Sequence, residues 1–481
     1  MFWKGVIGYL PANLVQGVVG LLSIVVFTRL LSPAAYGAYA LAFSAMSLVH
    51  TLGFTWLEAA MARFYAAEAE RGRLPDHFAT LYRSYLGLTI AMAMIAGAVV
   101  WLLPLEPPLK IAVAAGLAAI PARSLARLAQ EHRRAAGRVR ASALLDMGQT
   151  GGAFLIGAGL AALGAGGAAP LIGLGLAAVL CLVFVLPEEL EIARGGHFDR
   201  RQASVYAHYG VPVSLSLILA LAIATTDRFV LAAYLGPASV GVYHAGYSLS
   251  NRTLDVLFIW LGAAGGPAAV AALERGGPAA LERTAREQAS LMLLVCLPAA
   301  VGLALVAKPL AALMVGADLS GGAARVTPWI AFSGFFSGIT TYYLHTAFTL
   351  GRRTKRLLLA MTIPAAANLA LTLVLIPRFG LDGAMWATAA SYLIGALASW
   401  GLGRAAVSLP VPWNALWRCA AAAAGMAVAV SLVPAGGGLL ELVDKAAVGI
   451  VAYAVLAFAL DAADVRSRGG ELVRALHRVA A

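Results

Sequence analysis

Two distant stretches of the chain read almost alike. Residues 31–43 are LSPAAYGAYALAF and residues 235–247 are LGPASVGVYHAGY, so that Leu, Pro, Ala, Gly and Tyr recur in register. Proline fixes φ after a helix ends, and glycine lets a chain reverse and two backbones approach closely. Tyrosine favours the boundary between membrane and water. We interpret the pair as one structural turn that occurs twice and binds no substrate itself.

The composition predicts the fold class, an all-α polytopic membrane protein. Of the 481 residues, 61% are hydrophobic and 12% are charged, and the mean hydropathy is +0.83. Soluble proteins have ~45–50% apolar and ~25% charged residues. Apolar runs of about 20 residues, enough for one helix to cross a bilayer, recur along the chain. No large soluble insert is left for a catalytic domain outside the membrane, and we interpret Cys181, Cys296 and Cys419 as small core residues.

The hydropathy pattern predicts about fourteen transmembrane helices. Basic residues gather in alternate loops between them, a pattern that favours cytoplasmic N- and C-termini and argues against nucleic acid as the partner of this +12 chain. The expected spans are residues 5–31, 36–61, 82–103, 108–128, 142–165, 168–187, 206–234, 238–262, 289–315, 326–350, 357–376, 381–402, 413–433 and 443–461.

The repeated turn predicts how these spans are organised. Six spans, an even number, separate its two copies, so both copies lie on the outer face and the halves are parallel repeats. We expect two parallel six-helix lobes around a central cavity, plus two extra C-terminal helices. The predicted boundaries are an N-lobe at 1–190, a cytoplasmic linker at 191–205, a C-lobe at 206–405, and spans thirteen and fourteen with a basic cytoplasmic tail at 406–481.

Charged residues inside the spans are the candidate functional residues, because a charge in a bilayer is costly and usually faces a cavity or a partner. Arg252 and Asp255 have the i, i+3 spacing of a pair along one helix face, and Arg252 is the strongest candidate because it is deep and central. The other charged candidates are Asp227 and Arg228 in the seventh span and Arg123 and Arg127 in a polar stripe of the fourth.

Two interpretations of these charges stay open. In one, Asp227 with Arg228 and Arg252 with Asp255 are structural ion pairs, and the stripe of the fourth span is a helix emerging among lipid headgroups. In the other, the arginines line a water-filled cavity and hold a phosphate or pyrophosphate, whose oxygens the guanidinium fork matches bidentately. Tyr342 and His345 could add hydrogen bonds or stacking on a sugar, or be ordinary core residues.

No enzymatic constellation is present in the sequence. It contains no H-E-x-x-H pair and no Walker loop, and its eight histidines are scattered. We therefore expect no enzyme activity, no metal and no cofactor, and transport driven by a gradient or by consumption of the cargo.

Several segments resemble a known family. TTDRFVLAAYLGPASVGVYHAGYSL at 225–249 resembles the seventh and eighth helices of the polysaccharide-exporter, O-antigen flippase (Wzx-type) branch of the multidrug/oligosaccharidyl-lipid/polysaccharide (MOP) flippase superfamily. LLSPAAYGAYAL and ARFYAAE are similar to its first turn and second helix. The segment from LGRRTKR through PAAANLALTLVLIPRFGLDGAMWATAASY is similar to its eleventh and twelfth helices. The resemblance covers residues 1–405.

The resemblance implies an alternating-access flippase in the bacterial inner membrane. Its cargo would be a polyprenyl-(pyro)phosphate-linked oligosaccharide, moved from the inner to the outer leaflet for O-antigen, capsule or exopolysaccharide synthesis. The implied partners are that lipid-linked oligosaccharide, membrane lipid, and a polysaccharide polymerase and glycosyltransferases. The alternatives are a lipid II flippase and a cation-coupled small-molecule or drug antiporter of the same superfamily. A membrane-embedded polymerase or ligase would need a large outer loop, and the loops here are short.

Overall fold

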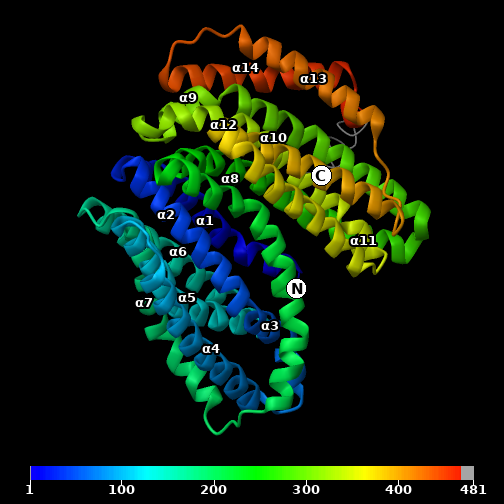
Figure 1. Cartoon of the computed structure of the whole chain (residues 1–481). Coiled ribbons are helices and arrows are strands. Elements are labelled where there is room, and N and C mark those ends of the chain that lie inside the picture. The colour runs from blue at the N-terminus through cyan, green and yellow to red at the C-terminus, as the bar shows by residue number, and fades with distance from the viewer. Residues whose placement is uncertain (1, 467–481) are drawn as a thin grey trace. The chain divides into compact units, whose positions relative to one another are not determined.

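The computed structural model describes residues 2–466, and all regular structure in that range is helical (Figure 1). The predicted basic tail therefore lies largely outside the described residues. The helices are α1 (Phe2–Leu30), α2 (Pro33–Gly53), α3 (Thr55–Glu70), α4 (Leu74–Leu102), α5 (Pro107–Ala135), α6 (Val139–Ala162), α7 (Ala169–Ala193), α8 (Arg200–Leu305), α9 (Ala307–Met314), α10 (Ala317–Ile339), α11 (Thr346–Leu350), α12 (Thr354–Arg404), α13 (Trp413–Ser431) and α14 (Gly438–Ala459). Three single turns complete the set: η1 (Gly166–Ala168), the π-helical η2 (Thr340–Leu344) and η3 (Ala462–Asp464).

Two of these helices are too long to be one span each. A helix needs about 20 residues to cross the hydrocarbon core, whereas α8 has 106 residues and α12 has 51. Three glycines with positive φ interrupt them: Gly236 (77°) and Gly277 (67°) in α8, and Gly380 (58°) in α12. Only glycine adopts this region without strain, so these residues mark the chain reversals. The spans predicted on either side are thus separate helical segments.

The predicted fold class is confirmed by this architecture. Within residues 2–466, seven helices are long and apolar enough to cross a membrane, or eight if α2 and α3, which are bent by 45°, form one span. That number counts α8 and α12 once each. When they are divided at their glycines and the shorter α6, α10 and α13 are included, the helical segments correspond one to one with the fourteen predicted spans.

The chain forms two compact units, residues 1–244 and 245–481. In the first unit α7 packs against α5 and α6, α6 against α1, and α5 against α2. The side chains at its centre are aromatic and aliphatic, among them the fully buried Phe54, Phe78 and Tyr206. The predicted lobe boundaries rest on the sequence repeat, not on packing, and stay a prediction.

The two copies of the repeated turn pack against each other inside the first unit. A Cβ added to Gly37 would lie 1.7 Å from the Pro237 carbonyl oxygen, and one added to Gly241 would lie 2.3 Å from the Pro33 carbonyl oxygen. Each glycine thus faces the proline of the other copy. The expectation of close backbone approach is confirmed. The expected role in chain reversal is wrong for Gly37, which lies inside α2, because Pro33 already begins that helix.

The tyrosine of the second copy, Tyr243, is buried within the protein, which the expected interfacial position did not anticipate. Tyr243 is 0% exposed, and its hydroxyl donates a hydrogen bond to the buried Asp227 carboxylate. A phenol is held inside the protein here because a buried carboxylate needs a donor. The sequence argument considered the tyrosine alone and did not include this partner.

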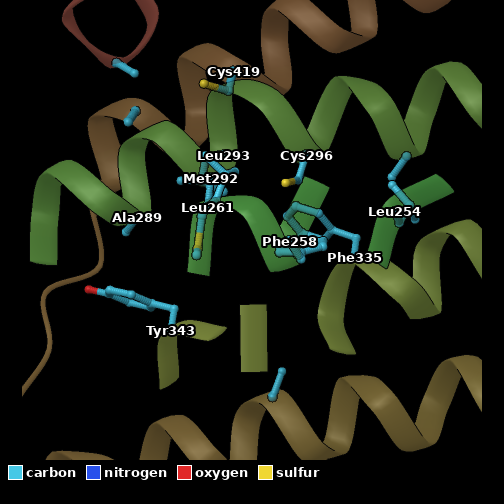
Figure 2. Packing of buried hydrophobic residues seen from close by; sticks show 14 of the residues in the cluster. Leu254, Phe258, Leu261, Ala289, Met292, Leu293, Cys296, Phe335, Tyr343 and Cys419 are labelled. Carbon is cyan, nitrogen blue, oxygen red and sulfur yellow. The ribbon is translucent and has the colours of Figure 1, made fainter. Parts of the chain in front are cut away.

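In the second unit α10 packs against α12 and α9, and α13 packs against α14. Its core joins α8, α10 and α13, with Phe258, Met292 and Phe335 at the centre (Figure 2). Cys296 and Cys419 are 0% exposed and lie in this core, as expected from the sequence. The Tyr343 hydroxyl donates to the Pro410 carbonyl at 2.6 Å and so fixes the connection between α12 and α13.

Candidate functional site

The polar stripe of α5 forms the centre of a side-chain cluster in the first unit. Arg123 is partly buried, and its guanidinium carbon lies 5.8 Å from the centre of the Phe43 ring. One terminal nitrogen of Arg123 is fully buried and has no hydrogen-bond partner among the described residues. Because this nitrogen is shielded from water, it carries positive charge without a compensating acceptor.

Arg127, one helical turn further along α5, has one partner on α6 and one on α5 itself. Its guanidinium lies 3.8 Å from the Asp146 carboxylate of α6, and it donates to the Gln130 side-chain oxygen at 3.2 Å. Asp146 also accepts a hydrogen bond from the Gln16 amide of α1. Arg127 is 39% exposed, so it reaches the surface of the unit while its charge is partly balanced.

The bend between α2 and α3 brings one more pair of ionisable side chains to this cluster. The Glu58 carboxylate lies 3.0 Å from the His50 ring nitrogen, and Glu58 acts electrostatically on Arg123. Helices α1, α2, α3, α5 and α6 therefore all contribute to one group of side chains, which we call the α5 arginine cluster: Gln16, His50, Glu58, Arg123, Arg127, Gln130 and Asp146.

Asp227 and Arg228 point toward different partners. The Asp227 carboxylate accepts from the Tyr243 hydroxyl, whereas Arg228 donates to the Ser44 hydroxyl of α2 at 3.1 Å. Both side chains are buried, with exposures of 0% and 6%. These contacts join α2 to the two segments of α8 that meet at Gly236, which favours a structural role for this pair.

The expected pairing of Arg252 with Asp255 is an electrostatic interaction and not a close ion pair. Asp255 accepts a hydrogen bond from the Asn251 amide at 2.5 Å, and no ion pair within 4.0 Å joins it to Arg252. Helical side chains tilt toward the N-terminus of their helix, so Asp255 reaches back toward Asn251 while Arg252 points further away. The order with the base before the acid is also the weaker one in helices.

Tyr342 and His345 lie at the π-helical turn η2. The Tyr342 ring stacks on Phe258 with centroids 6.3 Å apart, and the Gln288 amide donates to the Tyr342 carbonyl at 3.2 Å. The His345 ring nitrogen lies 3.3 Å from the Ser399 hydroxyl. Both residues are packed into the second unit, as the core interpretation expects, although π-helical turns are frequent at functional sites.

Sequence reasoning missed a buried ion-pair network in the first unit. Glu189 of α7 is 0% exposed and contacts three groups: Arg133 at 2.5 Å, the Tyr82 hydroxyl at 2.7 Å and the His132 ring at 2.8 Å. Its neighbour Glu188 contacts Arg133 at 2.6 Å and also pairs with Arg138. The signal was available, because the basic EHRR and the acidic PEEL stretches end the fourth and sixth spans on the same predicted side.

A second polar pair was also missed, on α12. The side-chain amide of Asn368 and the hydroxyl of Thr372 are fully buried and have no hydrogen-bond partner among the described residues. They lie four residues apart and hence on one helix face. Neutral polar residues within an apolar span give only a weak sequence signal, which the charge-based search passed over.

Comparisons with known proteins agree with this architecture. The family described as "Polysaccharide biosynthesis protein" matches residues 26–320, more than half of the chain and the whole α5 arginine cluster except Gln16. The search of curated proteins by sequence gives no match.

Solved structures share the fold at low sequence identity. The lipid II flippase MurJ, in an inward closed conformation, superposes with a TM-score of 0.79 at 13% identity, covering 94% of this chain and 98% of that one. An inward-facing multidrug resistance MATE transporter superposes with a TM-score of 0.70 at 15% identity, covering 82% of this chain and 94% of that one. A MOP-superfamily transporter from Pyrococcus furiosus superposes with a TM-score of 0.56 at 15% identity, covering 84% of this chain and 93% of that one. The chain thus has the fold of MOP-superfamily transporters, and it belongs to the polysaccharide biosynthesis protein family.

Proposed function

We propose that this protein is a flippase that moves a polyprenyl-(pyro)phosphate-linked oligosaccharide from the inner to the outer leaflet for surface polysaccharide synthesis. The observation that carries the proposal is Arg123, an arginine inside a membrane span with a buried guanidinium nitrogen that lacks a partner among the described residues. The family membership supports the polysaccharide pathway, and the shared fold supports transport.

An anion with several oxygens is the ligand that suits this site. A guanidinium offers five donors in a planar fork and binds phosphate oxygens bidentately. Arg127 stands one turn away and shares its charge with Asp146, so a pyrophosphate that approaches Arg123 can also draw on Arg127. We propose that Arg123 is the principal phosphate contact and that Arg127 is the second.

The carboxylates within the spans favour a lipid-phosphate cargo over an organic cation. A cation antiporter would be expected to use an unpaired carboxylate inside the membrane. Here Glu58 contacts His50, Asp146 contacts Gln16 and Arg127, Asp227 accepts from Tyr243, and Asp255 accepts from Asn251. Asp146, Asp227 and Asp255 are thus each engaged by a donor from the protein, whereas Glu58 lies beside His50 with one buried oxygen that has no hydrogen-bond partner among the described residues.

In the second unit we propose Arg252 as a further cargo contact. It is exposed at the surface of its unit and has no hydrogen bond or ion pair with the described residues. Tyr342 and His345 remain proposed sugar contacts. We further propose that the protein resides in the bacterial inner membrane with both termini in the cytoplasm, as the distribution of basic residues predicts.

Transport in proteoliposomes tests the function. The purified chain is reconstituted with a fluorescent undecaprenyl-pyrophosphate-linked oligosaccharide, and the fraction that reaches the opposite leaflet is measured by quenching. We expect Arg123→Gln to slow transport by about tenfold or more, since a charge-assisted hydrogen bond is worth ~1.5–3 kcal/mol. Arg123→Lys keeps the charge but loses the guanidinium fork. Its transport rate should therefore lie between that of the unchanged protein and that of Arg123→Gln.

Arg140→Gln is the matched control. Arg140 is exposed on α6 and forms no ion pair with the described residues, so its substitution removes the same charge outside the α5 arginine cluster. Equal transport by the Arg123→Gln and Arg140→Gln variants, both folded by size-exclusion chromatography, would show that Arg123 does not bind the pyrophosphate. A chain that transports an organic cation such as ethidium, and not the lipid, would contradict the flippase assignment itself.

A further inference from the structure

A cavity of about 520 Å³ lies within the second unit, away from every residue proposed above as a cargo contact. Three segments form its walls: residues 283–290 of α8, residues 411–418 at the beginning of α13, and residues 463–464 in η3. The volume falls in the range of ~300–1,000 Å³ that is usual for small-ligand sites. The side chains that matter for the argument are Arg283, Arg286, Glu287, Trp413, Arg418 and Asp464.

The cavity presents an unusual number of guanidinium groups. Arg418 is held in place because it donates to the Asp461 backbone carbonyl at 3.0 Å. Arg286 pairs with Glu282 at 2.8 Å on the exposed side of α8. Arg283 has no hydrogen bond or ion pair with the described residues and is exposed. At least one cationic fork is therefore available to an anion that enters the cavity.

Two carboxylates share the cavity with these arginines, those of Glu287 and Asp464. A purely anionic ligand would be repelled by them, whereas a phosphate ester that also carries an amine or hydroxyl group would satisfy both kinds of side chain. The arginines would receive its phosphate oxygens, and the carboxylates would accept hydrogen bonds from its donors. This is the chemistry of a glycerophospholipid headgroup such as phosphatidylethanolamine or phosphatidylglycerol.

Two tryptophans place the cavity at headgroup level. Trp413 lines it and is 66% exposed, and Trp417, one turn further along α13, is 54% exposed. The Arg418 guanidinium lies 5.8 Å from the centre of the Trp417 ring. Exposed tryptophan beside arginine at the beginning of a span is typical of the membrane–water interface. In the predicted topology all three walls also belong to the cytoplasmic ends of their spans.

We propose that this cavity is a binding site for the headgroup of a membrane phospholipid, with Arg283 and Arg286 as phosphate ligands and Glu287 as the acceptor for the headgroup's amine or hydroxyl. The site is distinct from the α5 arginine cluster, and its existence does not depend on the proposed cargo. A lipid bound there would join the beginning of α13 and η3 to α8, and so fix the two C-terminal helices to the rest of the unit.

Native mass spectrometry of the full chain in detergent tests the proposal. Short-chain phosphatidylglycerol, phosphatidylethanolamine and phosphatidylcholine are titrated separately, with inorganic phosphate as the soluble anion. We expect one phosphatidylglycerol or phosphatidylethanolamine to bind more tightly than any later one. Phosphatidylcholine should bind more weakly, because its headgroup has no hydrogen-bond donor for the carboxylates.

Charge-neutralising variants locate the binding. The double variant Arg283→Gln/Arg286→Gln should lower the affinity for the first lipid by about tenfold or more. This is the scale of one lost charge-assisted hydrogen bond. Arg275→Gln/Arg353→Gln removes the same charge from exposed residues outside the cavity and should leave binding unchanged. Circular dichroism of both pairs checks that they are folded.

Three outcomes would overturn the proposal. The first is equal lipid binding by the two double variants, which would place the lipid elsewhere. The second is a tight site for inorganic phosphate that excludes the lipids, which would identify a soluble anion as the ligand. The third is equal affinity for all three headgroups. None of these results bears on transport of the lipid-linked cargo, so the flippase proposal and this one fail separately.

Discussion

Replacing Gly37 by alanine tests the packing of the two repeated turns. The added Cβ would lie 1.7 Å from the Pro237 carbonyl oxygen, and an ordinary contact begins at 3.4 Å. The two backbones would thus have to separate by about 1.7 Å. Neither side can yield by a side-chain rotation, because the atoms in the way are the carbonyl of Pro237 and the backbone nitrogen of Gly241.

The cost follows from known overpacking energies. Insertion of one methyl group into a well-packed interior costs ~1–3 kcal/mol when side chains can adjust. Because backbone meets backbone here, we expect about 3 kcal/mol for Gly37→Ala. Gly241→Ala, with a contact of 2.3 Å, should cost somewhat less. The double variant should cost less than the sum, since one separation of the turns relieves both clashes.

Thermal unfolding in detergent, followed by tryptophan fluorescence at a fixed scan rate, measures the effect. Gly87→Ala on α4 is the matched control, because a Cβ there meets nothing within 4 Å. It should be neutral or stabilising by ~0.5–1 kcal/mol through helix propensity. For a unit of this size, 3 kcal/mol corresponds to a Tm lower by about 6–12 °C. A Gly37→Ala variant that melts within about 2 °C of Gly87→Ala would refute the backbone contact between the two turns.

Further predictions concern ion pairs and hydrogen bonds at three depths, all measured by the same thermal unfolding. Glu189→Ala should destabilise the chain by ~3–5 kcal/mol, because it leaves the buried Arg133 without its carboxylate, and unchanged stability would contradict the network. Tyr243→Phe removes the donor to the buried Asp227 carboxylate and should cost ~1–3 kcal/mol; a stabilised variant would argue against that bond. Arg325→Ala breaks an exposed pair and should change stability by less than ~1 kcal/mol, so a loss as large as that of Glu189→Ala would contradict the assigned exposure.

The repeated turn has a packing role that its sequence alone did not show in full. It was expected to mark equivalent helices and to reverse the chain. In the structure its two copies are in contact. Tyr243 of the second copy and Arg228, which precedes that copy, form hydrogen bonds that hold the junction between α2 and α8. Asp227 and Arg228 thus look like cargo-binding charges in the sequence, but in the structure they form hydrogen bonds at this junction.

Sequence by itself determined the fold class and the helices. Apolar runs of span length have only one stable backbone solution in a bilayer, in which every peptide group is hydrogen-bonded within its own helix. Local composition therefore predicts each span, and positive-φ glycines such as Gly236 and Gly380 separate spans that the hydropathy pattern had already distinguished. The stripe of Arg123 and Arg127 could be recognised for the same reason, since charges within a span stand out.

Only the tertiary structure decided which charges have partners. Asp255 accepts a hydrogen bond from Asn251 and not from Arg252. Glu189, which directly follows the predicted sixth span, is the buried centre of an ion-pair network. Sequence spacing limits which residues of one helix can meet, but partners from other helices depend on packing between spans far apart in the chain. Arg123 is a candidate for binding the cargo because the fold brings Phe43 of α2 and Glu58 of α3 near it and leaves one of its nitrogens without an acceptor among the described residues.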